Sequence, residues 1–138
     1  MTTTPQVTRS FSADYEAMRS LGPWLAAEMP RLGCPPELIE RTGEIELALH
    51  ELAVNTIDHA IGIGQGELTI EMEYDGEASE LAVVCRDRGE AFDVEAWPAA
   101  PQAPQVRGYG LMIIEQLASS IEYRRVDESN EWLVTFDG

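Results

Sequence analysis

Three side chains that could take part in chemistry follow one another at four-residue intervals: Glu51, Asn55 and His59. The stretch around them consists of good helix formers, without Gly or Pro between Glu44 and Ile61, which predicts an α-helix. On such a helix the spacing stacks a carboxylate, an amide and an imidazole along one edge of the apolar face. That edge can bury its core side and still present polar groups to a ligand.

Two later segments combine glycines with charged and aromatic residues. The first, DRGEAFD, contains Asp87, Gly89 and Phe92, and the second, RGYGL, occupies residues 107–111. Because glycine has no side chain, its backbone amide can approach a phosphate closely, and the favourable place for this is a helix N-terminus. The second segment precedes a predicted helix, and Arg107 adds a charge that can pair with phosphate.

Each segment taken alone also has a purely structural interpretation. A Glu and an Asn four residues apart are more often solvated helix residues, and a lone G-x-G is more often a turn that starts a helix. Asp58, Phe92 and Asp93 also have a purely structural interpretation, as capping and packing residues, and the three tryptophans are interpreted as packing residues. The functional interpretation rests on the order in which the three segments occur.

In that order, the segments resemble the N box and the two glycine boxes of the GHKL superfamily, which contains gyrase, heat-shock chaperones, histidine kinases and mismatch-repair ATPases. The patterns E-L-x-x-N-x-x-x-H-A, D-x-G-x-x-F-D and G-x-G-L-x-I-I look most like those of bacterial anti-sigma factor serine kinases. The resemblance covers about residues 8 to 136. It implies the histidine-kinase-like ATPase fold, an α+β two-layer sandwich.

The resemblance implies roles for the residues of the first segment. Asn55 would bind Mg²⁺ through its side-chain oxygen, since oxygen ligands suit this hard ion. Glu51, one turn earlier, would be the general base that takes a proton from the acceptor hydroxyl. His59 would line the nucleotide site.

Roles carry over to the two glycine segments in the same way. Asp87 would accept a hydrogen bond from the adenine amino group, and Gly89 would leave space for the base. Arg107 would contact the terminal phosphate of ATP. The remaining residues expected to contact or line the nucleotide are Gly108, Tyr109, Gly110, Leu111 and Phe92.

The sequence departs from the family pattern at three places. Ser129, Asn130 and Glu131 stand where the family commonly carries Gly-Thr or a similar small pair, so no adenine contact is assigned there. Arg107 directly precedes Gly108, whereas related sequences can hold this base a residue away. The segment expected to form the ATP lid, residues 93–107, is rich in proline and lacks lysine.

The implied function is that of an ATP- and Mg²⁺-dependent serine/threonine protein kinase acting as an anti-sigma factor. Such proteins sequester a sigma factor and phosphorylate a STAS-type antagonist, often as homodimers. The main alternative is an ATP-binding regulatory module that sequesters its partner without phosphotransfer. A further alternative is the catalytic half of a split histidine kinase, whose phosphoacceptor would lie on a separate helical domain.

Composition narrows the classes of partner. The chain has 25 acidic and nine basic residues, all of the latter arginine, for a net charge of -16. Such a field repels nucleic acid and anionic membranes, and it favours a basic protein surface. With only two histidines and two isolated cysteines, Cys34 and Cys85, no zinc site and no disulfide is expected. The N-terminus shows no export signal, so a cytoplasmic location is expected.

The 138 residues are predicted to form one domain, with a loose tail at residues 1–5. The order of the predicted elements (strand, helix, helix, hairpin, loop, helix, hairpin) predicts a mixed sheet that carries its helices on one face. Two helices are predicted between the first and second strands. The first runs from Ser12 or Asp14 to about Arg31, and Gly22 and Pro23 introduce a break or kink in it. The second runs from near Pro36 to the glycines after Ile61. The other predicted elements are strands 6–12, 68–74, 80–86, 121–126 and 132–136 and a helix at 111–120.

Overall fold

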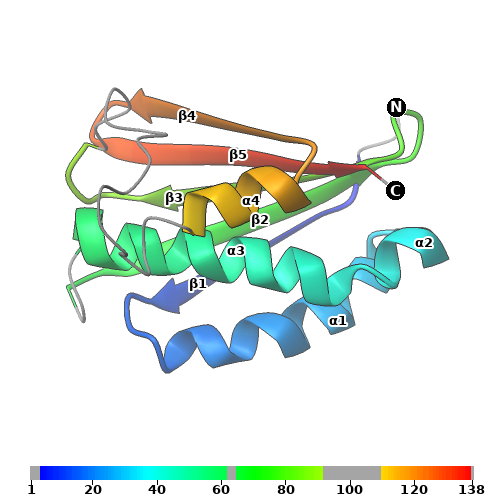
Figure 1. The fold of residues 1–138 in the computed structure, drawn as a ribbon, viewed down its shortest axis with the longest axis horizontal. Helices are drawn as coiled ribbons and strands as arrows, with labels where there is room; N and C mark the ends of the chain where they lie inside the picture. Colours follow the sequence, from blue (N-terminus) through cyan, green and yellow to red (C-terminus); the bar gives the residue numbers. More distant parts are fainter. Residues whose placement is uncertain (1–3, 62–64, 92–109, 138) are drawn as a thin grey trace.

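A computed structural model describes residues 4–61, 65–91 and 110–137. They form two layers, a β-sheet and a set of helices that covers one of its faces (Figure 1). The α+β sandwich predicted from the sequence is therefore confirmed. Most of the expected tail, at residues 1–3, and the expected lid, at residues 93–107, lie outside the described residues.

The sheet contains five strands in the spatial order β1-β2-β3-β5-β4. Every pairing among the described strands is antiparallel, so the prediction of a mixed sheet was wrong. A helix between two strands permits a parallel crossover, but β1 and β2, which flank the helices, run in opposite directions. The strands are β1 (Gln6–Ser12), β2 (Glu67–Asp75), β3 (Glu80–Asp87), β4 (Ser120–Val126) and β5 (Ser129–Asp137).

The central strands alternate between a buried and a half-exposed face, which for β2 agrees with its alternating sequence. On β2 the buried side chains are Leu68, Ile70 and Met72, and β3 and β5 continue the same apolar layer. The helices pack their apolar faces against this layer, which forms one hydrophobic core. The face of the sheet away from the helices carries charged residues.

The helical layer begins later in the chain than its periodicity suggests. Asp14 accepts a hydrogen bond from the Ala17 amide (2.7 Å) and so starts a 3-10 turn in place of an α-helix. Pro23 then lies in the first turn of α1, where its missing amide hydrogen would have no helical partner. Gly22 and Pro23 therefore stand at the helix start and introduce no kink in its middle. The two elements are η1 (Ala17–Ser20) and α1 (Leu21–Arg31).

The central helix is divided where the sequence predicts continuity. A short α2 (Pro36–Ile39) is followed by α3 (Thr42–Thr56) and by the π-helical turn η2 (Ile57–Ile61). Between them the Arg41 guanidinium donates to the carbonyls of Leu117 (2.8 Å) and Asp137 (3.0 Å), residues distant in sequence. Arg41 thus ties the start of α3 to the end of the last helix, α4 (Gly110–Leu117). None of the helices in the described ranges is long and apolar enough to cross a membrane.

Both cysteines are free and buried, as predicted. Burial raises the pKa of the Cys34 thiol to about 11 and that of the Cys85 thiol to about 12. Because the thiolate is the reactive form, both side chains behave as small apolar core residues.

Gly33 ends α1 with a backbone φ of +88°. Its amide donates to the Pro30 carbonyl (3.1 Å) and the next amide donates to the Met29 carbonyl (3.2 Å), the pattern of a Schellman cap. A Cβ at Gly33 would meet no atom within 4 Å, so the cost of Gly33→Ala is purely conformational. We expect this variant to lose about 1 kcal/mol in the free energy of unfolding, measured by urea denaturation.

Gly43→Ala is the matched control for this prediction. A Cβ at Gly43 also meets open space, but the residue lies inside α3 with ordinary helical geometry. The added methyl should therefore leave stability unchanged or raise it slightly. Equal losses in the two variants would contradict the role of positive φ at Gly33.

Candidate functional site

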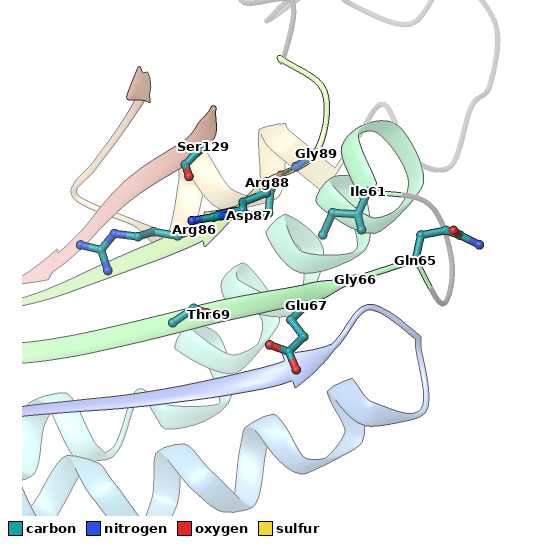
Figure 2. Close-up of a pocket in the computed structure, with 10 residues that line it drawn as sticks. All are labelled: Ile61, Gln65, Gly66, Glu67, Thr69, Arg86, Asp87, Arg88, Gly89 and Ser129. Atoms are coloured by element: carbon teal, nitrogen blue, oxygen red, sulfur yellow. Dashed lines mark hydrogen bonds between the residues drawn. The ribbon is translucent and has the colours of Figure 1, made fainter. Parts of the chain in front are cut away.

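A cavity of about 540 Å³ opens at one end of the sheet. Figure 2 shows that its walls come from the last residue of η2, from the start of β2 and from the end of β3. Two residues predicted from the sequence, Asp87 and Gly89, line it together. The other lining residues are Ile61, Gln65, Gly66, Glu67, Thr69, Arg86, Arg88 and Ser129.

Asp87 is the last residue of β3, and its side chain is buried, with 4% exposed. One carboxylate oxygen, Oδ1, accepts hydrogen bonds from the Asn130 amide nitrogen (2.9 Å) and from the Gly89 backbone amide (2.8 Å). The other, Oδ2, is buried and accepts no hydrogen bond from the described residues. A buried carboxylate oxygen without a donor is costly. Oδ2 of Asp87 can therefore accept a hydrogen bond from a group other than the described residues.

Burial also raises the pKa of the Asp87 carboxyl above its ordinary value. The hydrogen bonds from Asn130 and Gly89 and the positive charge of Arg125 act in the opposite direction, because they favour the ionised form. Burial thus favours the neutral acid, and three neighbours favour the carboxylate.

This balance predicts how the stability of the domain depends on pH. At pH 7 we expect Asp87→Asn to raise the midpoint of thermal unfolding by a few degrees, since a neutral amide avoids burying a charge. The folded protein binds the Asp87 proton more tightly than the unfolded chain does. As pH falls, protonation of Asp87 therefore stabilises the wild type relative to the variant, which lacks this group. The difference between their midpoints should shrink as pH falls toward the Asp87 pKa. A difference that does not depend on pH would contradict this account.

Asn130 is the residue of the candidate site that sequence reasoning did not assign. It lies directly opposite Asp87 in the β3–β5 pairing and is 1% exposed. Its sequence position gave one signal, a departure from the family pattern, but its contact with Asp87 spans 43 residues. Arg125 lies beside it and also donates to the Gly89 carbonyl (2.7 Å), which holds the turn after β3 in place.

Asn55 and Glu51 lie on α3, as predicted, and neither lines the described cavity. The Asn55 side chain is 7% exposed, and its amide nitrogen donates to the Glu51 carbonyl (3.0 Å). Its oxygen, Oδ1, accepts no hydrogen bond from the described residues, which leaves an oxygen suited to a hard cation. Within ranges 4–61, 65–91 and 110–137, no group of three or more His, Cys, Asp or Glu side chains could hold a metal. Among the described residues, the Asn55 amide oxygen is therefore the candidate donor to such a cation.

The π-helical turn connects this amide to the cavity. It follows α3 directly, and its last residue, Ile61, lines the cavity wall. Such turns occur frequently at functional sites. His59 lies in this turn, but its side chain is outside the described residues.

The second glycine segment is described only where α4 begins. The helix starts at Gly110 and packs beside α3, the helix that carries Asn55 (Figure 1). A helix at this place was predicted, although it ends at Leu117 and not at residue 120. Outside the described residues lie the side chain of Leu111 and the whole of Phe92, Arg107, Gly108 and Tyr109.

The charged residues that line the cavity are two arginines and two acids, a more positive balance than that of the whole chain. Arg86 is engaged by Glu71 (2.7 Å) and Glu131 (3.0 Å) on the outer face of the sheet. Arg88, in contrast, lines the cavity and forms no ion pair with the described residues. In a protein of net charge -16, such a cation offsets the repulsion of an anionic ligand.

Comparisons with known proteins agree with this geometry. The sequence model of the histidine kinase-like ATPase domain matches residues 11–136. No curated protein matches the chain. Two solved structures share its fold: the RsbU and RsbW domains of Rv1364c from Mycobacterium tuberculosis (17% identity, TM-score 0.67) and the histidine kinase domain of a blue-light activated histidine kinase from Erythrobacter litoralis (15% identity, TM-score 0.52).

Each match covers a larger share of this chain than of the solved chain. The first covers 97% of this chain and 32% of the mycobacterial chain, and the second covers 91% of this chain and 60% of the other. The chain thus corresponds to one part of each of those longer proteins. At these identities the likeness shows a common fold.

Proposed function

The chain belongs to the family of histidine kinase-like ATPase domains, and we propose that it is an ATP- and Mg²⁺-dependent serine/threonine protein kinase of the anti-sigma type. Family membership implies ATP binding. The choice of kinase is supported by the patterns around Glu51, Asp87 and Gly108 and by the fold shared with a structure that contains an RsbW domain.

The observation that carries the proposal is the unpaired Oδ2 of Asp87. The Asp87 carboxylate lines a cavity of suitable size for a purine base, and its Oδ1 is already occupied by Asn130 and Gly89. An exocyclic amino group is the donor that would satisfy Oδ2, and adenine carries one. The residues present therefore fit the nucleotide that the family implies.

Asn55 would hold the metal ion through Oδ1, since its amide nitrogen is already bound to the helix backbone. When bound, Mg²⁺ neutralises charge on the phosphates of ATP, which phosphoryl transfer requires. The further phosphate contacts that we propose, from Arg107, Gly108 and Gly110, come from the segment that leads into α4.

Glu51 would act as the general base of the transfer. It lies one helical turn before Asn55 and is half-buried. Its carboxylate would accept the proton of the serine or threonine hydroxyl while that oxygen attacks the terminal phosphate.

The proposed partners are a sigma factor, which the protein sequesters, and a STAS-type antagonist, which it phosphorylates. The net charge of -16 supports binding to a partner with a basic surface. A homodimer and a cytoplasmic location belong to the same proposal.

The direct test incubates the protein with labelled ATP, Mg²⁺ and each STAS-domain protein of the same genome. We expect one of them to acquire phosphate that is stable in acid, as phosphoserine and phosphothreonine are. Acid-labile phosphate would instead indicate a histidine kinase.

The alternative is a nucleotide-binding module that sequesters its partner without phosphotransfer. It is favoured by one observation: Glu51 does not line the described cavity. Mg²⁺-dependent ATP binding without phosphate on any partner would establish this alternative.

A further inference from the structure

Asn130 is held by four hydrogen bonds to side chains and backbone. Its amide nitrogen donates to Oδ1 of Asp87 (2.9 Å) and to the Glu90 carbonyl (2.8 Å). Its amide oxygen accepts from the Tyr123 hydroxyl (2.5 Å) and from the Arg125 guanidinium (3.0 Å). A primary amide has two N–H donors and an oxygen with two lone pairs, so every group of Asn130 is used.

This bonding pattern fixes which way the amide faces. If oxygen and nitrogen were exchanged, the oxygen would face the Asp87 carboxylate and the Glu90 carbonyl, and the nitrogen would face the Arg125 guanidinium, which can only donate. Both arrangements are repulsive, so only one orientation is compatible with the network. The Asp87 carboxylate therefore always meets a donor at Oδ1, and Oδ2 remains the unpaired acceptor.

The sheet holds this network rigidly. Asn130 is paired with Asp87 on one side and with Arg125 on the other, across β3, β5 and β4. The Tyr123 ring packs against Trp132, with ring centroids 4.8 Å apart, which fixes the direction of its hydroxyl group. Groups held on strands are positioned more precisely than groups on loops.

We propose that Asn130 is a positioning residue that makes the site selective for a base with an exocyclic amino group. The inference rests on the proposed ATP binding and adds to it the residue that sets base selectivity. Asn130 acts through Asp87: by donating to Oδ1 it favours the carboxylate form, which can only accept hydrogen bonds. Such a group binds the amino group of adenine and rejects a carbonyl at the same ring position.

Without the Asn130 donor, burial would shift Asp87 toward its neutral acid. The neutral acid carries a hydrogen and can donate as well as accept. It would therefore discriminate poorly between an amino group, a carbonyl and a plain C–H edge.

The first test compares ATP with purine riboside triphosphate, which lacks only the 6-amino group, by titration calorimetry on the full chain with Mg²⁺. For Asn130→Leu, of similar size, we expect ATP affinity to fall about tenfold. Affinity for the analogue should change by less than about twofold. Equal losses for both ligands would leave the preference for ATP unchanged. That result would show that Asn130 only supports the fold, and it would overturn the proposal.

A milder variant guards against misfolding of Asn130→Leu. Tyr123→Phe removes one hydrogen bond to the Asn130 oxygen and leaves the packing against Trp132 in place. We expect it to weaken ATP binding about threefold without affecting the analogue. Tyr74→Phe, a change of the same kind on β2, is the matched control and should alter neither affinity.

A second readout needs no nucleotide. The Asp87 pKa can be followed by a pH titration of its side-chain carboxyl carbon in NMR spectra, with the wild type and both variants. We expect a higher Asp87 pKa in Asn130→Leu than in the wild type, because a bond that favours the carboxylate is lost. An unchanged pKa would refute the inference. If the wild type bound no nucleotide while the pKa still rose, the proposed function would fail, and the control of Asp87 by Asn130 would stand.

Discussion

Replacing Asn55 with alanine is expected to reduce Mg²⁺-dependent ATP affinity by about a hundredfold, the upper end of what changes around a metal site cost. The physical reason is that Oδ1 of Asn55 is the oxygen proposed to hold the ion, and without the ion the phosphates of ATP face a protein of net charge -16. Titration calorimetry with ATP, in the presence of Mg²⁺ and then of a chelator, measures the effect. In the chelator, wild type and variant should bind ATP equally weakly.

The fold should tolerate this substitution. The one hydrogen bond lost, from the amide nitrogen to the Glu51 carbonyl, lies within the helix, and alanine is the better helix former. Asn55→Asp, which keeps an oxygen at the same place, should retain more of the Mg²⁺ dependence than Asn55→Ala. His50→Ala, on the same helix, controls for nonspecific effects. Full ATP affinity in Asn55→Ala would remove this residue from the metal site.

Local patterns were sufficient to predict the elements that carry the site. The absence of Gly and Pro between Glu44 and Ile61 predicted the helix that carries Glu51 and Asn55. The alternation in β2 and the apolar run at residues 80–86 predicted the two strands of this hairpin, and Asp87 follows that run as the last residue of β3. Period and helix propensity act over a few residues, so they can be read from the chain directly.

Contacts between distant residues were not predictable in the same way. The break between α2 and α3 lies where Arg41 reaches Leu117 and Asp137, 76 and 96 residues away. The role of Asn130 depends on the pairing of β3 with β5, which places it opposite Asp87. The same long-range pairing made the sheet antiparallel throughout its described strands. The proposed contacts of Phe92, Arg107, Gly108 and Tyr109 stay predictions.

The proposed adenine subsite departs from the family pattern at residues 129–131, and the structure shows what stands there. Small residues at this point of β5 would leave Asp87 to be satisfied by other donors. Asn130 instead fills the position and supplies the donor directly, and Tyr123 and Arg125 hold its amide in turn. The departure at residues 129–131 therefore coincides with a built network at Asp87.

Glu51→Ala is expected to lower the rate of phosphoryl transfer about a thousandfold while ATP affinity changes by less than about threefold. A general base contributes to the transition state, in which the acceptor proton moves, and contributes little to the binding of ATP. Single-turnover transfer from labelled ATP to the STAS-domain substrate identified with the wild type measures the rate, and calorimetry measures the affinity.

Two further variants decide whether proton transfer is the cause. Glu51→Gln keeps the size and polarity of the side chain but cannot accept the proton, so it should be as slow as Glu51→Ala. Glu46→Ala removes a different carboxylate of the same helix, one that lies next to Gly22 of α1. This variant should transfer phosphate at the wild-type rate. If Glu51→Gln retained the wild-type rate, Glu51 would act through its shape or its hydrogen bonds and not as a base. If ATP affinity fell in parallel with transfer, Glu51 would belong to the nucleotide site, and the base would have to be sought elsewhere.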